Sequence, residues 1–313
     1  MHPSLPSKPP KQPQPGFLFL PPFRVQGISI AGEATVISVP ELDLCFDLGA
    51  CPRFAVTADT VALSHGHMDH AAGLAYYFSQ RHFLGCSPGT VVCHPTLEGP
   101  IRAVMSAWVG IERQRTPFQL VPLGNNQETA LKGNVVLRAF ENKHTSHSLG
   151  FVAVEKRSKL LPELAGKTAD EIIAMKREGL PVTGLLEIPL VAFTGDTAWG
   201  DHLMREDLLS AKILIAECTF VDGGDDGKAD IGRHMHLQDV LELVSLSKAD
   251  HIVLTHLSRR THMPAAREAI FSALKPADRE RVHLLMDHRA NRARFEKQLA
   301  EAGTTEDALP EAQ

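Results

Sequence analysis

The chain has 313 residues, of which 43% are hydrophobic and 22% are charged. A chain of this length and composition can bury one large core, so we expect a single folded domain. The formal net charge of −5 and the pI near 6.3 exclude a protein that is coated with positive charge for nucleic-acid binding. A polyanion would therefore have to bind at a local basic patch or at metal ions.

Residue runs and cysteine spacing exclude further classes of protein. No run of 18 apolar residues is present, so we expect no membrane-spanning segment and no membrane partner. Eight of the first 22 residues are proline, which is unlike a signal peptide and predicts a disordered, polyproline-like tail over residues 1–16. A polar tail is expected over 304–313.

The five cysteines form no C-x-x-C pair, which indicates reduced thiols and a cytoplasmic protein: Cys45, Cys51, Cys86, Cys93 and Cys218.

The first half of the chain alternates between strand-like and helix-like patterns. β-Branched runs and period-two alternation predict strands. Apolar residues at helical spacing predict amphipathic helices. We expect strands over 27–30, 34–39, 42–47, 118–123 and 135–140, and helices over 71–78 and 97–115.

A segment over residues 155–189 interrupts the strands and carries a helix of its own. Thr168 followed by Glu171 forms a capping box, and Gly179 with Pro181 ends the helix. Lysines and arginines balance acidic residues here, so we expect a short inserted surface helix whose lysines are able to reach phosphates.

The second half contains continuous apolar strands of the kind that are buried on both faces. Asp196, Glu217 and His256 stand at or just beyond the ends of three of them. Since α/β sheets gather ligand-binding groups at the carboxyl ends of their strands, we expect these side chains at one edge. The predicted strands are 190–194, 213–217, 251–255 and 282–286, and the predicted helices begin at 237 and cover 264–274 and 291–302.

Four metal-binding side chains occupy six positions after the apolar run that ends at Leu63. His65 and His67 alternate, so they project to the same side of an extended segment. Asp69 and His70 follow where the helical pattern starts, and so point in another direction. Imidazole nitrogen and carboxylate oxygen are ligands for zinc, with manganese, iron or cobalt as alternatives. One loop is therefore expected to serve two neighbouring metal ions.

This stretch resembles the H-x-H-x-D-H signature of the metallo-β-lactamase superfamily. The further ligands that the superfamily supplies have counterparts in His144, Asp196 and His256, with His147 as a competitor of His144. The resemblance implies an α/β fold, the αββα sandwich, as one domain over residues 17–303. Alternation of strands and helices alone would equally permit a doubly wound sheet.

Within the superfamily, the chain is similar to ribonuclease Z, and the closest likeness is to the short form of the plant cytosolic kind. The motifs run in order from about residue 24 to 287. Phe151 and Thr261 depart from the family pattern, which usually has tyrosines there, and no Gly-Pro-rich arm is visible between 155 and 189. The matching motifs are Phe46-Asp47-x-Gly49-x-Cys51-Pro52, Ser64-His65-x-His67-Met68-Asp69-His70, Ser148-x-Gly150-Phe151, Phe193-Thr194-Gly195-Asp196-Thr197, Glu217-Cys218-Thr219-Phe220 and Thr255-His256-x-Ser258-x-Arg260.

The resemblance implies a role for each matching residue. Asp69 orients the attacking water, and His236, oriented by Glu217, donates a proton to the leaving oxygen. His234 is expected to be an accessory surface residue, and Asp47 either supports a ligand from behind or only caps a turn. Ser258 and Arg260 either contact phosphate or pack. His65, His67 and His144 are implied to hold one zinc, Asp69, His70 and His256 the other, and Asp196 both.

We therefore expect a zinc-dependent endoribonuclease that removes the 3′ trailer from precursor tRNA, with no DNA partner and as a homodimer. The alternatives are a small-molecule phosphodiesterase or other hydrolase, and a catalytically silent RNA-binding module. Seven retained ligands argue against a silent site. The expected contacts to tRNA phosphates are Arg113, Arg115, Lys156, Arg157, Lys159, Lys176, Arg177, Arg259, Arg260 and Arg267.

Overall fold

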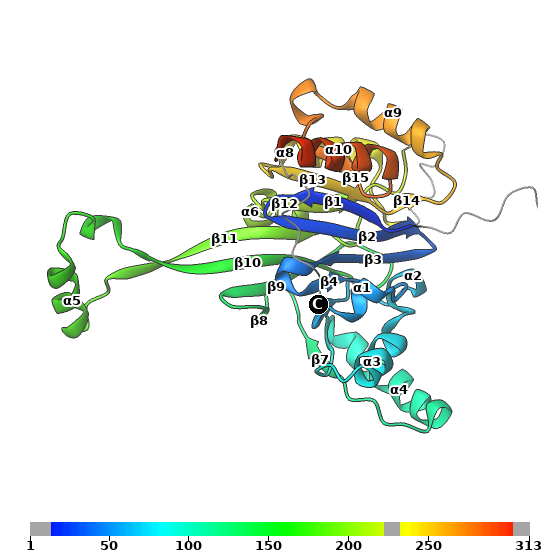
Figure 1. The fold of residues 1–313 in the computed structure, drawn as a ribbon, viewed down its shortest axis with the longest axis horizontal. Coiled ribbons are helices and arrows are strands. Elements are labelled where there is room, and N and C mark those ends of the chain that lie inside the picture. Colours follow the sequence, from blue (N-terminus) through cyan, green and yellow to red (C-terminus); the bar gives the residue numbers. More distant parts are fainter. Residues whose placement is uncertain (1–13, 222–231, 303–313) are drawn as a thin grey trace, which may run out of the picture.

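A computed structural model describes residues 14–221 and 232–302. Two β-sheets lie face to face, with helices on the outer face of each, so the expected αββα sandwich is confirmed (Figure 1). The first sheet has the strand order β1-β2-β3-β4-β5-β6-β7, and β14 pairs with β2. Its strands are β1 (Gly16–Leu20), β2 (Phe23–Ala31), β3 (Ala34–Val39), β4 (Leu44–Phe46), β5 (Thr60–Ala62), β6 (Thr90–Cys93), β7 (Gln119–Pro122) and β14 (Leu257–Ser258).

The second sheet has the strand order β15-β13-β12-β11-β10-β9-β8. Strands β11, β12, β13 and β15 are parallel neighbours, so the carboxyl ends of β11, β12 and β13 reach the same edge. The strands of this sheet are β8 (Glu128–Ala130), β9 (Val135–Glu141), β10 (Leu149–Leu160), β11 (Thr183–Phe193), β12 (Ile213–Glu217), β13 (His251–Thr255) and β15 (Val282–Leu284).

The main core lies between the two sheets. Phe46 of β4 and Phe193 of β11 meet there with ring centroids 4.7 Å apart. Phe151 and Ile215 are fully buried in the same cluster. Because β12 and β13 of the second sheet are covered by the first sheet on one face and by helices on the other, their sequences are largely apolar without alternation.

Helices pack on both outer faces of the sandwich. The first sheet is covered by α1 (Arg53–Val56), α2 (Met68–Ala71), α3 (Leu74–Phe83) and α4 (Pro95–Glu112), and the second by α6 (Glu206–Leu209), α8 (Leu237–Leu246) and α9 (Met263–Ala273). α10 (His288–Glu301) packs against β1, where Phe295 meets Phe17 edge to face at 5.4 Å. Short 3-10 turns cover Pro40–Leu42, Pro162–Leu164, Asp201–Leu203 and Pro276–Asp278.

Strands β10 and β11 run far beyond the sheet as a two-stranded arm that carries α5 (Ala169–Arg177) near its tip (Figure 1). The predicted helix and its capping box at Thr168 and Glu171 are confirmed. The prediction that the strands stop near 155 and resume near 190 was wrong. The pairing continues from Glu155 opposite Ile188 to Leu160 opposite Thr183, so backbone hydrogen bonds build the arm without a core beneath it.

The N-terminal region also differs from the prediction. Residues 16–20 form β1, an edge strand that was not among the predicted strands, and the predicted tail overlaps it only at Gly16. The rest of the predicted tails, over 1–13 and 304–313, lies outside the described residues. None of the described helices combines the length and hydropathy that crossing a bilayer requires.

Candidate metal centre

The loop that carries His65 and His67 is fixed from behind by Asp47. The Asp47 carboxylate accepts hydrogen bonds from the backbone N–H of Ser64 at 2.7 Å and from its hydroxyl at 2.8 Å. The same carboxylate lies 2.8 Å from Nδ1 of His70. This contact holds a proton on Nδ1 and turns Nε2 of His70 toward the cluster, where it can bind a metal ion. Of the two interpretations of Asp47, support behind a ligand is therefore the one that the geometry favours.

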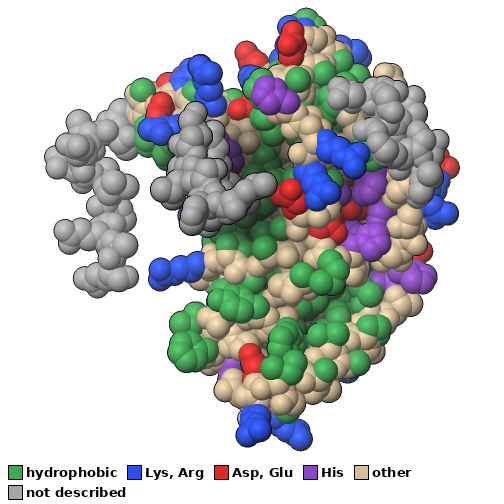
Figure 2. Space-filling model, turned by 90° about the vertical axis from the view of Figure 1, so that its right-hand side faces the viewer, with side chains coloured by type: hydrophobic (Ala, Val, Ile, Leu, Met, Phe, Trp, Pro, Cys, Tyr) green, Lys and Arg blue, Asp and Glu red, His purple; other side chains and the backbone are tan. Residues whose placement is uncertain are grey.

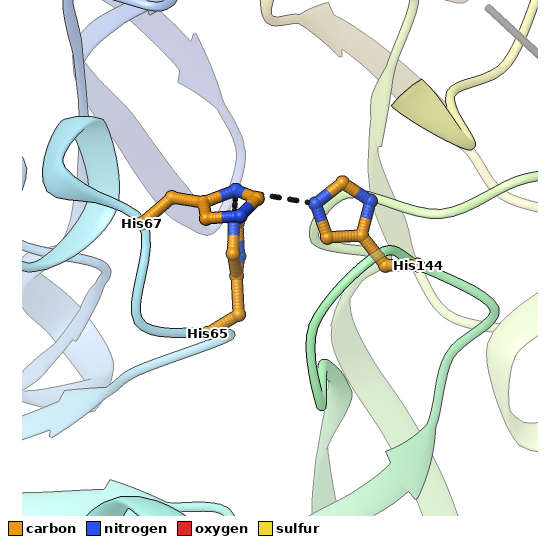
Figure 3. Close-up of side chains that lie close together, drawn as sticks. All are labelled: His65, His67 and His144. Atoms are coloured by element: carbon orange, nitrogen blue, oxygen red, sulfur yellow. Dashed lines mark hydrogen bonds between the residues drawn. The ribbon is translucent and has the colours of Figure 1, made fainter. Parts of the chain in front are cut away.

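Three histidines form the first cluster. Nε2 of His65 lies 2.9 Å from Nδ1 of His67, and Nε2 of His144 lies 3.3 Å from the same atom. His65 and His67 come from one loop, and His144 faces them from the loop between β9 and β10 (Figure 3). His147 is exposed and stacks on His94 at 4.6 Å, outside the cluster. Of the two histidines, it is therefore His144 whose ring lies in the cluster.

The second cluster joins Asp69, His70 and His256. Nε2 of His70 lies 3.3 Å from Nε2 of His256, and Oδ2 of Asp69 lies 3.6 Å from Nε2 of His256. Asp69 is held in place by the backbone N–H of Gly32, which donates to its Oδ2 at 2.8 Å. Each of the three residues offers one donor atom, and the three atoms lie within 4.8 Å of one another.

Asp196 lies between the two clusters and is buried. Its Oδ2 is 3.8 Å from Nε2 of His65, 3.2 Å from Nε2 of His70 and 3.4 Å from Nε2 of His256. Burial opposes the charge on Asp196, but the neighbouring His256 and His70 outweigh it and hold the pKa of the carboxyl well below its usual range. A single ionised oxygen therefore faces ligands of both clusters.

The donor set fits a bound cation. Nδ1 of His70 contacts Asp47 and Nδ1 of His256 contacts the Thr219 hydroxyl at 2.9 Å, so their Nε2 atoms point at the same spot. Two nitrogens this close need a positive charge between them, which a metal ion supplies when bound and a proton supplies otherwise. Burial opposes the protonation of His70, but Asp196 and Asp47 outweigh burial and raise the pKa of His70 well above its usual range. Burial, with the charge of His70, lowers the pKa of His65 to about 2, which keeps that ring in the neutral form that binds metal. Imidazole nitrogens with carboxylates are the donor set of dinuclear hydrolytic zinc sites.

Glu217 pairs with His234, which corrects the expectation that Glu217 orients His236. The Glu217 carboxylate is buried, and its two oxygens lie 3.2 and 3.1 Å from Nδ1 of His234. The His234 ring stacks on His256 at 5.4 Å and meets His144 at 5.1 Å. Burial opposes its protonation, but Glu217 outweighs burial and raises the pKa of His234 to about 9. His234 is thus part of the centre, although it was expected at the surface.

His236 lies at the start of α8 instead. Its backbone N–H donates to Asp239 at 2.9 Å, and its ring lies against Phe220 at 5.7 Å. Its ring is absent from the groups of possible metal ligands found among the described residues. The two histidines are separated only by Met235, and the sequence offers no local sign of which one turns inward. Arg233, just before His234, adopts a left-handed conformation with φ 53°.

Arg233 also contributes contacts that the sequence pattern did not reveal. Its Nη1 donates to the backbone oxygen of His144 at 3.0 Å, and Nδ1 of His144 lies 3.3 Å from the backbone oxygen of Arg233. These two contacts join the loop before α8 to the loop between β9 and β10. They fix the ring of His144, with Nε2 toward His67.

Ser258 and Arg260 lie beyond His256 and outside the groups of possible metal ligands that the described residues form. The Ser258 backbone N–H donates to Thr219 at 3.1 Å, and its hydroxyl accepts from the Arg260 N–H at 3.4 Å. The Arg260 side chain is exposed. On the face shown in Figure 2, histidine side chains reach the surface beside acidic and basic ones.

Comparison with known proteins gives the family. Residues 51–257 match the family model described as beta-lactamase superfamily domain. The chain is 31% identical to tRNase Z TRZ1 of Arabidopsis thaliana over 84% of this chain and 95% of that protein. It is 29% identical to the chloroplastic tRNase Z TRZ2 of the same plant over 79% of this chain and 71% of that protein.

Solved structures share the fold at low sequence identity. The metallo-beta-lactamase fold protein YhfI from Bacillus subtilis has a TM-score of 0.59 at 15% identity, over 84% of this chain and 96% of that chain. The short form of human tRNase Z has a TM-score of 0.53 at 17% identity, over 82% of this chain and 93% of that chain. With two histidine clusters that share one aspartate on an αββα sandwich, the chain belongs to the tRNase Z family of the metallo-β-lactamase superfamily.

Proposed function

We propose that this protein is a zinc-dependent endoribonuclease that cleaves the 3′ trailer from precursor tRNA. The observation that carries the proposal is the pair of clusters that share Asp196, next to the Glu217–His234 pair. The relatives named tRNase Z point to tRNA as the substrate. When bound, two zinc ions supply a water of near-neutral pKa and offset negative charge on the phosphodiester.

Some residues of the centre would bind the zinc ions, and others would transfer protons. We assign His65, His67 and His144 to one zinc, Asp69, His70 and His256 to the other, and Asp196 to both. Asp69 also orients the attacking water and takes its proton. His234 replaces His236 as the proton donor to the leaving ribose oxygen, because Glu217 holds its Nδ1 and leaves Nε2 to act.

Incubation with a precursor tRNA that carries a trailer tests the proposal directly. The expected products are a tRNA that ends in a 3′-hydroxyl and a trailer that begins with a 5′-phosphate. End-group analysis of the two fragments identifies them. Cleavage of a small phosphodiester without any cleavage of precursor tRNA would instead favour the phosphodiesterase function.

The support of His70 by Asp47 predicts a metal-binding defect. Asp47→Asn removes the charge behind His70, so metal affinity should fall roughly 10- to 100-fold. Asp43→Asn is the matched control, because Asp43 has the same backbone conformation, with φ 57° against 58°, but does not touch the centre. Elemental analysis after dialysis against a weak chelator measures the loss, and should find about two zinc ions per wild-type chain. Equal metal content in the two variants would show that Asp47 does not support metal binding.

The Glu217–His234 pair predicts which histidine moves the proton. His234→Ala should retain both metal ions and lose roughly 10²–10⁴-fold in turnover, the usual contribution of a positioned acid. His236→Ala is the control and should stay close to wild type. Single-turnover cleavage with parallel metal analysis separates the roles. A large loss in His236→Ala with full activity in His234→Ala would return the proton-donor role to His236, and metal loss in His234→Ala would make His234 a ligand.

The arm is the element that we propose to grip the tRNA. Its basic residues are not equivalent, since Lys156 is ion-paired with Glu128 and Arg157 with Glu155 at 2.7 Å. Within the described ranges, Lys159, Lys176 and Arg177 form no ion pair and remain open to phosphates. Arg267 is ion-paired with Asp287 at 2.9 Å, which weakens its candidacy for a tRNA contact.

Neutralising the unpaired arm cations should therefore affect tRNA alone. The triple change Lys159→Gln, Lys176→Gln and Arg177→Gln should raise KM for precursor tRNA and leave hydrolysis of a small phosphodiester intact. The slope of log affinity against log salt should fall by roughly one for each cation that no longer binds a phosphate. Arg157→Gln is the matched control, because its charge is already paired. If both substrates respond alike, the arm is only structural.

A homodimer is proposed from the apolar surface of α3 and α4. Val104, Trp108 and Ile111 share one face of α4 and are exposed, and Phe83 with Leu84 at the end of α3 are 81% and 61% exposed. Apolar side chains gather on the lower part of the face in Figure 2. A second copy of the chain would cover this surface.

Light scattering of the purified protein should give twice the chain mass of 34.2 kDa. Ile111→Ser together with Val104→Ser should shift the protein to the monomer, because the smaller apolar area weakens association. Leu246→Ser, at an exposed leucine of α8, should leave the dimer intact. A monomeric wild type at micromolar concentration contradicts the proposal.

The cytoplasm remains the proposed compartment. Its support is the set of five free cysteines, since a reducing compartment keeps such thiols unpaired. The names of two relatives contain the words chloroplastic and nuclear, so the family occurs in more than one compartment. Fractionation with compartment markers tests the assignment.

A further inference from the structure

A cavity of about 640 Å³ lies at the end of the second sheet that faces away from the metal centre. Its lining includes His251 at the start of β13, His283 in β15, and Arg294 in the middle of α10. His256, the metal-centre residue, follows the opposite end of β13. A strand of five residues spans roughly 17 Å, so the cavity and the metal centre are separate sites.

The walls of the cavity carry an excess of positive charge. Arg267, Arg279, Arg281, Arg294 and Lys297 line it, against two carboxylates, Asp250 and Glu280. Not all of these cations are available to a ligand. Arg267 contacts Asp287 at 2.9 Å, and Arg281 contacts Asp278 and donates to carbonyl oxygens at the end of α8, with 2.7 Å to Val244.

Among the arginines that line this cavity, Arg294 and Arg279 have no carboxylate partner within the described residues. Arg279 uses only its Nε, which donates to the backbone oxygen of Leu274 at 3.3 Å. Nε of Arg294 is buried and has no hydrogen-bond partner. The Arg294 side chain as a whole is half-buried, and its buried Nε is a donor whose lack of a partner is costly unless a ligand completes the contacts.

The two histidines of the cavity support the same interpretation. Nε2 of His283 lies 3.3 Å from Nδ1 of His251, so the pair contributes polar atoms next to Arg294. Burial, with the charge of Arg294, lowers the pKa of His283 to about 3, so the ring is neutral and adds no further positive charge to the cavity. An anion from outside the chain would supply the partner that Nε of Arg294 lacks among the described residues.

We propose that this cavity binds the phosphate group of a small phosphorylated molecule of nucleotide size. Two unpaired guanidinium groups match a phosphate monoester, which carries close to two negative charges, better than a single carboxylate. The volume lies in the range of about 300–1,000 Å³ that is common for small-molecule sites. Phe271 lines the same cavity and offers an apolar surface for the rest of the ligand.

Calorimetric titration of the zinc-loaded protein tests the proposal, with inorganic phosphate and a nucleoside 5′-monophosphate as probes. Arg294→Gln should weaken binding at least about tenfold, since glutamine cannot form the charge-assisted bidentate pair with phosphate. Arg292→Gln is the matched control on the same helix, because Arg292 is 79% exposed and pairs with Glu296. Arg279→Gln, at an exposed position, provides a second test that does not depend on a buried substitution.

Phosphate also has affinity for metal ions, so the location of the bound probe must be measured separately. NMR of histidine-labelled protein should show the ring signals of His283 and His251 moving with the probe, and these shifts should vanish in Arg294→Gln. Tighter binding of the monophosphate than of phosphate would show that the cavity also holds the nucleoside. The proposal is overturned if only metal-centre histidines respond, or if Arg294→Gln binds both probes like wild type. It is equally overturned if Arg294→Gln weakens precursor tRNA binding alone.

Discussion

The candidate centre depends on the buried Asp47 carboxylate more than on any other contact. It holds the backbone and hydroxyl of Ser64 and the ring of His70 at the same time. The two contacts to Ser64 set the path of the loop that carries His65 and His67. The contact to the His70 ring sets the direction in which His70 presents Nε2. Burial raises the pKa of this carboxyl, while His70 and Ser64 oppose that effect. The conformation of the loop and the ionised form of the buried Asp47 carboxylate therefore stabilise each other.

The sequence predicted those parts of the centre that depend on local order. His65, His67, Asp69 and His70 sit within six residues, so one loop brings them together whatever the rest of the fold does. The distant residues Asp196 and His256 were predictable because they follow buried parallel strands, whose ends share an edge. His234 was not predictable, because a left-handed turn at Arg233 decides its direction, and arginine gives no sign of such a turn.

The arm shows a second limit of sequence patterns. Strand prediction relies on burial, which produces runs or alternation of apolar residues. Beyond the sheet, β10 and β11 have no core to pack on, and exposed residues such as Lys159 and Leu185 give no such signal. The two segments pair through backbone hydrogen bonds, which every residue type except proline can form. Such pairing therefore leaves no pattern in the side chains. The fold class was thus predicted correctly, and the length of its longest hairpin was not.

The position of the arm in the chain has a consequence for how it can be altered. β10 begins shortly after His144, and β11 ends shortly before Asp196, so the two legs of the hairpin connect directly to residues on both sides of the centre. Almost all of the chain between the two residues is thus the arm itself. Phe151 pairs with Phe193 at the base of the hairpin, so a shortening of the arm that keeps this pair would leave both loops anchored to the sheet.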